Sequence, residues 1–125
     1  MSEVRALIVD DSSVMRKIVE RSLRQAGLDP MAVFEAGNGA EGLDQLKAQQ
    51  VDLILSDINM PGMNGLILLK LLKEHYPDLK VFMVTAYGDD KNYQAAKEYG
   101  ADNFLTKPID FVQLKKLMEE ANSPS

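Results

Sequence analysis

Acidic, hydroxyl and amine side chains stand at the ends of four short apolar segments. Asp10 and Asp11 follow RALIV, Asp57 follows VDLILS, Thr85 lies in KVFMVTA, and Lys107 follows NFLT. Carboxylates can ligate a divalent cation or attack a phosphoryl group. An ammonium group can stabilise the charge on a phosphoryl group in transfer. If the fold gathers these side chains, they indicate phosphoryl-transfer chemistry.

The charge of this group predicts a bound cation. The three aspartates carry three negative charges against the one positive charge of Lys107, which leaves an excess of two. Like charges at short range are unfavourable, and one divalent cation would balance them. Mg²⁺ prefers oxygen ligands and commonly binds one or two carboxylates together with a phosphate. We therefore expect Mg²⁺ beside Asp57, with Asp57 as the carboxylate nucleophile.

The segments that must position these residues alternate between two patterns. Short apolar runs, typical of buried strands, are followed by stretches with apolar residues at helical spacing. Ser12 or Ser13 can cap the first helix, and Gly27 can end it. We predict strands at residues 5–9, 31–36, 51–56, 80–86 and 103–106, the second with the weakest pattern. Helices are predicted at residues 14–26, 40–49, 66–76, 89–99 and 111–118.

Five strands alternating with five helices predict an α/β fold. Near-continuous apolar strands imply a parallel sheet that helices cover on both faces. The expected architecture is a flavodoxin-like, doubly wound sheet with strand order 2-1-3-4-5 and right-handed crossovers. In this order the first, third, fourth and fifth strands are adjacent, and ligands bind at their carboxyl edge. The three acids, Thr85 and Lys107 should therefore converge at that edge.

Length and composition predict a single domain over residues 1–125, with a short tail at 122–125. The chain has no cysteine, which excludes disulfides and thiolate metal sites. The lack of cysteine fits a reducing cytoplasm. An acidic start and the lack of an 18-residue apolar run predict a soluble protein without membrane insertion, and we expect a monomer. The net charge of −5 argues against direct DNA binding. It fits a cation site or a basic protein partner.

Four motifs occur in a set order: LIVDDSS, LILSDINMPGMNG, VTA and FLTKP. With these motifs the chain resembles the receiver domain of two-component response regulators, of the stand-alone CheY-like kind. The resemblance implies that Asp57 accepts a phosphoryl group from a histidine kinase and that the receiver then binds a downstream effector protein. It also implies that Asp11 and Asp57 bind Mg²⁺ directly, that Asp10 acts nearby or through water, and that the Asn59 carbonyl is a further ligand.

The resemblance assigns further roles around the phosphoryl group. It implies that Thr85 and Lys107 contact the phosphoryl oxygens, and that Thr85 and Phe104 form a switch. The Lys107–Pro108 bond is expected to be cis, which proline permits. Two positions depart from chemotaxis receivers, which typically have Tyr and Glu where this chain has Phe104 and Tyr87. The chemotaxis pathway is thus one candidate among others.

Two further expectations concern the lifetime of the phosphoryl group and the face that binds the effector protein. Asn59 and Tyr87 should flank the path of the hydrolytic water, and Tyr87 lacks a carboxylate to orient it. The output face is expected on the fourth helix, the fifth strand and the fifth helix. Its rim would include three lysines: Lys91, Lys97 and Lys115. The fourth helix has few apolar positions, so it should shift at little cost.

Three other functions compete with this interpretation. An Asp-nucleophile phosphatase or phosphotransferase of the haloacid-dehalogenase type needs a second Asp two residues after the first, and this chain has Asn59 there. We therefore expect self-catalysed phosphoryl uptake and hydrolysis, and no enzymatic turnover of a separate substrate. A flavin binder would place its phosphate beside Asp10 and Asp11, which would repel it. A phosphorylation-independent interaction module is the remaining alternative.

Overall fold

Five parallel strands form one sheet in the order β2-β1-β3-β4-β5, which confirms the predicted flavodoxin-like topology. The structure is a computed structural model that describes residues 4–27, 32–60, 62, 64–85, 88–107 and 110–121. Three of the predicted features lie outside these residues: Tyr87, Pro108 with its cis bond, and the tail at 122–125. The strands are β1 (Ala6–Val9), β2 (Val33–Ala36), β3 (Leu53–Asp57), β4 (Lys80–Thr85) and β5 (Asn103–Thr106).

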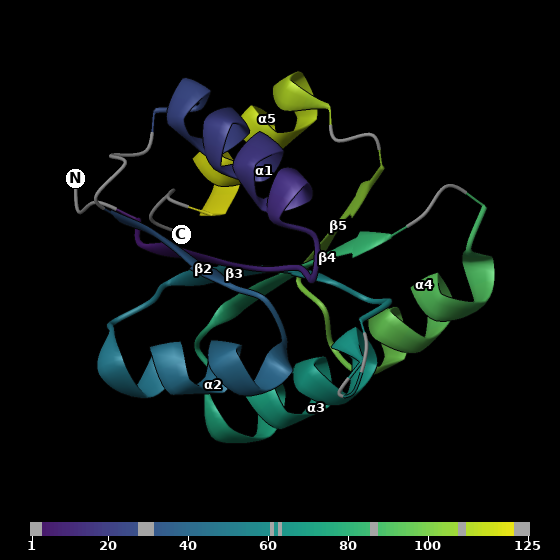
Figure 1. Ribbon diagram of the computed structural model, residues 1–125. Coiled ribbons are helices and arrows are strands. Elements are labelled where there is room, and N and C mark those ends of the chain that lie inside the picture. The colour runs from purple at the N-terminus through teal and green to yellow at the C-terminus, as the bar shows by residue number, and fades with distance from the viewer. Residues whose placement is uncertain are drawn as a thin grey trace.

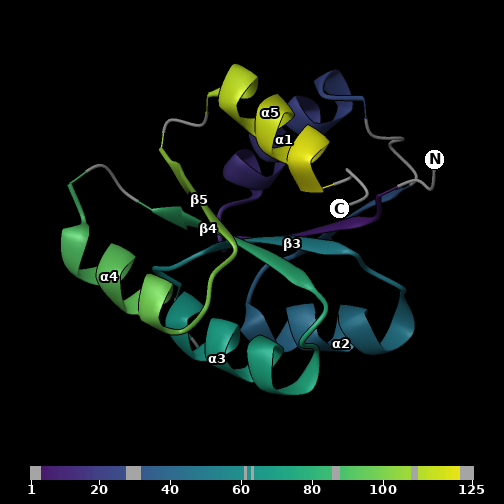
Figure 2. The same ribbon diagram turned by 180° about the vertical axis from the view of Figure 1, so that it is seen from behind.

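Helices cover both faces of this sheet. Figures 1 and 2 show α1 and α5 on one face and α2, α3 and α4 on the other. This arrangement follows from the strands, whose side chains alternate between the two faces and need an apolar partner on each. The helices are α1 (Ser13–Gln25), α2 (Gly39–Ala48), α3 (Gly65–His75), α4 (Asp90–Glu98) and α5 (Phe111–Ala121). Within the described part of the chain, none of them is long and apolar enough to cross a bilayer.

The core divides into two clusters, one on each face of the sheet. Leu7 and Val9 of β1 belong to one cluster, which includes Leu68 and Leu72 of α3. Ala6 and Ile8 belong to the other, which includes Leu23 of α1 and Leu114 of α5. Every residue of β1 and β3 is buried, whereas edge strand β2 is mostly half-buried. The weaker apolar pattern at 31–36 reflects this position at the edge of the sheet.

Local capping sets the helix boundaries near the predicted positions. Ser12, not Ser13, caps α1, and its hydroxyl accepts a hydrogen bond from the N–H of Met15. Asn38 caps α2 in the same way, so that helix begins at Gly39, one residue earlier than predicted.

The third strand ends at Asp57, one residue later than predicted, because Asp57 still pairs with Val84 of β4.

The chain turns from β3 into α3 at a very close backbone approach. The N–H of Gly65 donates to the carbonyl of Ile58 at 2.7 Å. A Cβ atom on Gly65 would lie 2.6 Å from the Cα of Ile58 and closer still to the carbonyl oxygen of Asp57. These neighbours are backbone atoms that cannot rotate away. Gly65 therefore lets α3 begin directly against the end of the strand that carries Asp57.

Replacing this glycine should destabilise the protein. We expect Gly65→Ala to lower the free energy of unfolding by about 1–3 kcal/mol, the usual range for overpacking. Urea denaturation monitored by circular dichroism measures it. Gly37→Ala is the matched control, because the nearest atoms to its Cβ would lie at an ordinary 3.6 Å. Equal stability of the two variants would contradict the close-approach argument.

Candidate functional site

Asp57 lies at the carboxyl edge of the sheet, as the last residue of β3. Only 6% of the surface of Asp57 is exposed. The pairing of Val9 with Ser56 places the next residues of the two strands, Asp10 and Asp57, side by side at this edge. The sheet register thus brings together two acids that are 47 positions apart in the sequence.

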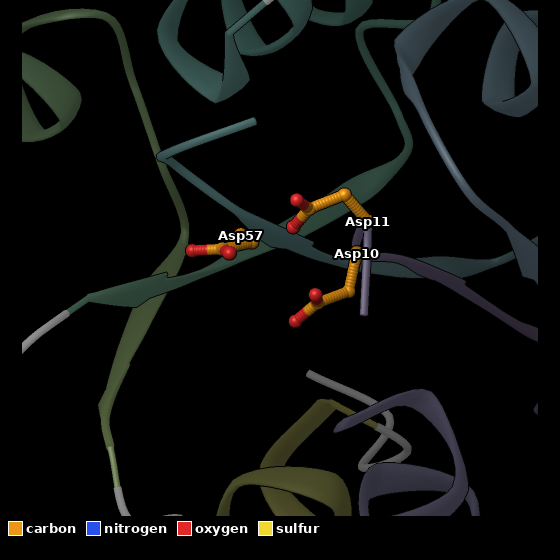
Figure 3. Close-up of side chains that lie close together, drawn as sticks. All are labelled: Asp10, Asp11 and Asp57. Atoms are coloured by element: carbon orange, nitrogen blue, oxygen red, sulfur yellow. The ribbon is translucent and has the colours of Figure 1, made fainter. Parts of the chain in front are cut away.

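Three carboxylates meet at this edge, as the sequence predicts. Oxygen atoms of Asp10, Asp11 and Asp57 all lie within 4.8 Å of one another. Figure 3 shows the three side chains close together, two from the chain after β1 and one from β3. Asp10 and Asp57 are buried, whereas Asp11 is exposed. The cluster therefore combines two acids that the protein has desolvated with one that faces solvent.

Lys107 is the cation that the structure places beside these acids. Its Nζ lies 3.2 Å from Oδ2 of Asp57 and 3.8 Å from Oδ2 of Asp10. Its backbone N–H donates to the carbonyl of Thr85 at 2.9 Å, which holds the lysine against the end of β4. One ammonium group thus contacts two of the three acids directly and leaves the cluster with excess negative charge.

Thr85 reaches the same edge from β4, but its hydroxyl has a different partner. Thr85 pairs with Thr106 of β5 and is buried. Its Oγ1 donates a hydrogen bond to the carbonyl of Leu105 at 3.4 Å. In this structure the hydroxyl is therefore bound to β5. A contact with a phosphoryl group on Asp57 would require this long hydrogen bond to give way.

The environment of Asp10 opposes its ionisation. Burial raises the pKa of the Asp10 carboxyl above its ordinary value of 3.8. A hydrogen bond from the N–H of Ser12 lowers this pKa, the negative charge of Asp57 raises it, Lys107 lowers it and Asp11 raises it, with burial the largest of these effects. The balance is upward, so the folded protein keeps a proton on Asp10 more readily than the unfolded chain does.

Of the remaining predicted site residues, the structure describes Asn59 and Phe104. Asn59 is exposed, two residues beyond Asp57. Phe104 lies in β5, half-buried, with its ring centroid 4.4 Å from that of Tyr93 of α4. The helix predicted at residues 89–99 ends at Glu98, so Tyr99 follows it and is 44% exposed. Tyr87 and Pro108 lie outside the described residues.

Sequence reasoning missed one side chain that touches the site. Arg16 of α1 donates from Nη1 to the backbone carbonyl of Asp10 at 2.6 Å. No motif signals this contact, because Arg16 stands among other charged residues on an amphipathic helix. Its place in the first turn after the acidic pair is the one clue that the sequence offers.

The donor set fits a hard divalent cation. Three carboxylates supply only oxygen ligands, and Mg²⁺ binds such oxygens while keeping several waters. The exposure of Asp11 leaves the cluster open to solvent on one side, which suits an ion that keeps part of its water shell. Asp10, Asp11 and Asp57 are thus the residues that would hold the ion.

Comparison with known proteins agrees with this geometry. The family model for the response regulator receiver domain matches residues 6–119. The chain belongs to this family. Receiver domains take a phosphoryl group from histidine kinases, generally bind Mg²⁺ at an acidic pocket, and act on downstream partners. The acidic cluster of this receiver occupies the edge of the sheet where that pocket is expected.

Relatives of this receiver include both short and long proteins. The chain is 44% identical over 118 residues to the DNA-binding transcriptional regulator NtrC of Klebsiella pneumoniae, covering 94% of this chain but only 24% of NtrC. A chemotaxis protein CheY homologue of Campylobacter jejuni is 38% identical, with 94% and 91% covered. The solved structure of Vibrio cholerae CheY4 superposes with a TM-score of 0.84 at 30% identity, covering 96% and 99% of the two chains.

The raised pKa of Asp10 predicts a pH-dependent effect on stability. Ionised Asp10 opposes folding, and this opposition is fully present above the folded-state pKa and disappears below the ordinary pKa of 3.8. Without Mg²⁺, Asp10→Asn should therefore raise the urea midpoint at pH 7, and the gain should shrink toward pH 4. Asn keeps an oxygen that can accept the Ser12 N–H. Asp44→Asn, on the exposed side of α2, is the control and should change little. A lower midpoint for Asp10→Asn at pH 7 would contradict this.

Proposed function

We propose that this receiver is a phosphorylation-activated signalling switch that accepts a phosphoryl group on Asp57 from a phosphohistidine kinase in a Mg²⁺-dependent reaction. The observation that carries the proposal is the convergence of Asp57 with two further acids and Lys107 at one edge of the sheet. Asp57 is the only residue of the group that is both buried in a strand and in direct contact with the lysine, at 3.2 Å. This placement suits a nucleophile that is held rigidly beside its electrostatic support.

The chemical step exchanges one bond to phosphorus for another. A carboxylate oxygen of Asp57 forms an O–P bond while the N–P bond to the kinase histidine breaks, and the histidine nitrogen keeps the electron pair. The product is an acyl phosphate. Attack by water later breaks its O–P bond, which restores the carboxylate and releases inorganic phosphate. This self-limited cycle needs no separate substrate, and we do not propose enzymatic turnover.

The surrounding residues divide the remaining work. Lys107, which lies between Asp57 and Asp10, would pair with a phosphoryl oxygen and hold it in place. Mg²⁺, held by the acidic cluster, would supply positive charge to the phosphoryl oxygens. Thr85 would leave the carbonyl of Leu105 and donate to the phosphoryl group instead. The carbonyl of Asn59 is proposed as a further metal ligand, and Asn59 with Tyr87 as the pair that tunes hydrolysis.

Movement of Thr85 would link the site to the output face. Phe104 lies on β5 and packs on Tyr93, so a shift of the Thr85 hydroxyl away from β5 would open space for the Phe104 ring. Helix α4 is well suited to respond, because Ala96 is its one buried residue. The proposed output face comprises α4, β5 and α5, with Lys91, Lys97 and Lys115 on its rim. Phosphorylation would shift a pre-existing equilibrium between two arrangements of this face.

We propose a cytoplasmic receiver that acts on a protein partner. NtrC, whose name is that of a transcriptional regulator, and a CheY homologue named for chemotaxis match this chain at 44% and 38% identity. A chemotaxis pathway is therefore one candidate role. A phosphatase is less well supported, because Asn59 stands where such an enzyme needs its acid–base carboxylate.

Phosphorylation is tested with acetyl phosphate and Mg²⁺. Asp57 should gain a phosphoryl group that is labile to base and hydroxylamine, as an acyl phosphate is, and Asp57→Asn should abolish the uptake. Intact-protein mass spectrometry measures the added mass, and peptide mapping after borohydride reduction locates it. Asp44→Asn, the same change on an exposed position of α2, should leave the uptake intact. Label on Ser12, Ser13 or Thr85 would overturn the assignment of Asp57.

The coupling between Asp57 and helix α4 is tested with the substitution Phe104→Ala. Beryllofluoride, a phosphoryl mimic, should change amide NMR shifts both around Asp57 and along α4 in the wild type. In Phe104→Ala the changes around Asp57 should persist while those along α4 shrink, because the ring that contacts Tyr93 is gone. Tyr99→Ala, an exposed ring just after the helix, is the control and should respond like the wild type. Full α4 shifts in Phe104→Ala would refute the proposed coupling.

A further inference from the structure

Arg16 connects three elements next to the acidic cluster. It lies in the first turn of α1, and its side chain is only 19% exposed. Its Nη1 donates to the backbone carbonyl of Asp10 at 2.6 Å, and its Nε donates to Oε1 of Glu35 at 3.1 Å. Glu35 belongs to edge strand β2. One guanidinium group therefore connects the start of α1, the end of β1 and the edge strand β2.

The carbonyl that Arg16 contacts belongs to the peptide group between Asp10 and Asp11. This group is planar, so fixing its oxygen fixes the plane from which the Asp11 backbone continues. Two other bonds hold the same turn. The N–H of Asp10 donates to the carbonyl of Ala36 at 3.1 Å, and the N–H of Ser12 donates to Oδ1 of Asp10 at 2.8 Å. The Arg16 bond adds the constraint on the carbonyl side.

Asp11 depends on this constraint more than its neighbours do. Its side chain is exposed, and its carboxylate has no hydrogen bond or ion pair with any part of the chain that the structure describes. Asp10 accepts from Ser12, and Asp57 contacts Lys107. No described side-chain contact holds the Asp11 carboxylate, so its backbone is the part of the chain that limits where it can lie relative to the other two.

The charge on Arg16 is compensated away from the acidic cluster. Glu35 accepts from Arg16 and also from Lys17, whose Nζ lies 3.2 Å from Oε2. The pair with Glu35 fixes the guanidinium plane, and the planar fork of Arg can serve both acceptors at once. Lys17 shares the helix, the charge and the partner of Arg16, but has no contact with Asp10 among the described hydrogen bonds.

We propose that Arg16 is a positioning residue for the cation site: by holding the Asp10 carbonyl, it sets the placement of the Asp11 carboxylate toward Asp57. This inference rests on the proposed function, because it assumes that the acidic cluster binds Mg²⁺. Residues behind the direct ligands commonly control metal affinity through the orientation of those ligands. Loss of Arg16 should therefore weaken cation binding while the fold and the three acids remain.

The test compares Arg16→Gln with Lys17→Gln. Amide NMR shifts during a Mg²⁺ titration give the dissociation constant without any phosphorylation, and thermal unfolding verifies the fold of each variant. We expect Arg16→Gln to raise the dissociation constant about tenfold, the lower end of the range for such outer partners. Lys17→Gln should bind like the wild type. In acetyl phosphate assays, Arg16→Gln should need more Mg²⁺ for half-maximal phosphorylation yet approach the wild-type rate at saturation.

The outcomes separate this inference from the proposed function. If Arg16→Gln binds Mg²⁺ as tightly as Lys17→Gln, the positioning role is wrong, although the receiver function stands. If the wild type binds no Mg²⁺ or takes up no phosphoryl group, the proposed function fails first. If Arg16→Gln does not fold, Arg16→Lys takes its place under the same criterion, because one ammonium cannot reproduce both bonds of the guanidinium group. Each Gln variant removes a positive charge, which by itself would strengthen cation binding. Weaker binding in both variants would therefore show that the contact with the Asp10 carbonyl is not the cause, and it would overturn the inference.

Discussion

Mutual repulsion of three carboxylates within 4.8 Å is the constraint around which the rest of this receiver is organised. Two of these acids are buried, so solvent does little to screen them. Lys107 relieves part of the repulsion through its contacts with Asp57 and Asp10. The excess negative charge that remains is unfavourable in the resting protein and favourable once a cation or its phosphoryl complex is bound. The same repulsion thus opposes folding and would favour binding of a cation.

The sheet can tolerate this unfavourable site because its core lies elsewhere. Leucine-rich clusters fill both faces of the sheet and leave the strands β1 and β3 almost wholly buried. Asp57 is the last residue of β3, and Asp10 and Asp11 directly follow β1, at the edge where the parallel strands end. Burial of the strands fixes the backbone, and the backbone in turn fixes the carboxylates. Stability and function therefore use adjacent residues of the same strands without competing for the same side chains.

The sequence predicts the fold and the gathering of the site well, because both follow from strand order. Once β1 and β3 are neighbours, the acids that end them must meet. Other features depend on side-chain geometry that no pattern encodes. The contact of Arg16 with the Asp10 carbonyl needs a particular rotamer, and the hydroxyl of Thr85 bonds to β5 instead of pointing to Asp57. Tyr99 fits a helical spacing, yet it falls after the end of α4 and is exposed.

Contacts along α4 are distributed unevenly, and this bears on how the receiver could change shape. Near the helix start, the Asp89 cap binds Asn92, which is a contact within the helix itself. Beyond its end, Asp102 accepts from Lys73 of α3 at 2.6 Å and from the N–H of Val81 at 2.8 Å. Tertiary hydrogen bonds thus hold the chain after the helix, whereas the side-chain hydrogen bonds described at its start are local and the tertiary contact there is the packing of Tyr93 on Phe104. Because a segment with few tertiary hydrogen bonds opens at lower free energy, the half of α4 nearer the carboxyl edge would be the half that responds first to phosphorylation.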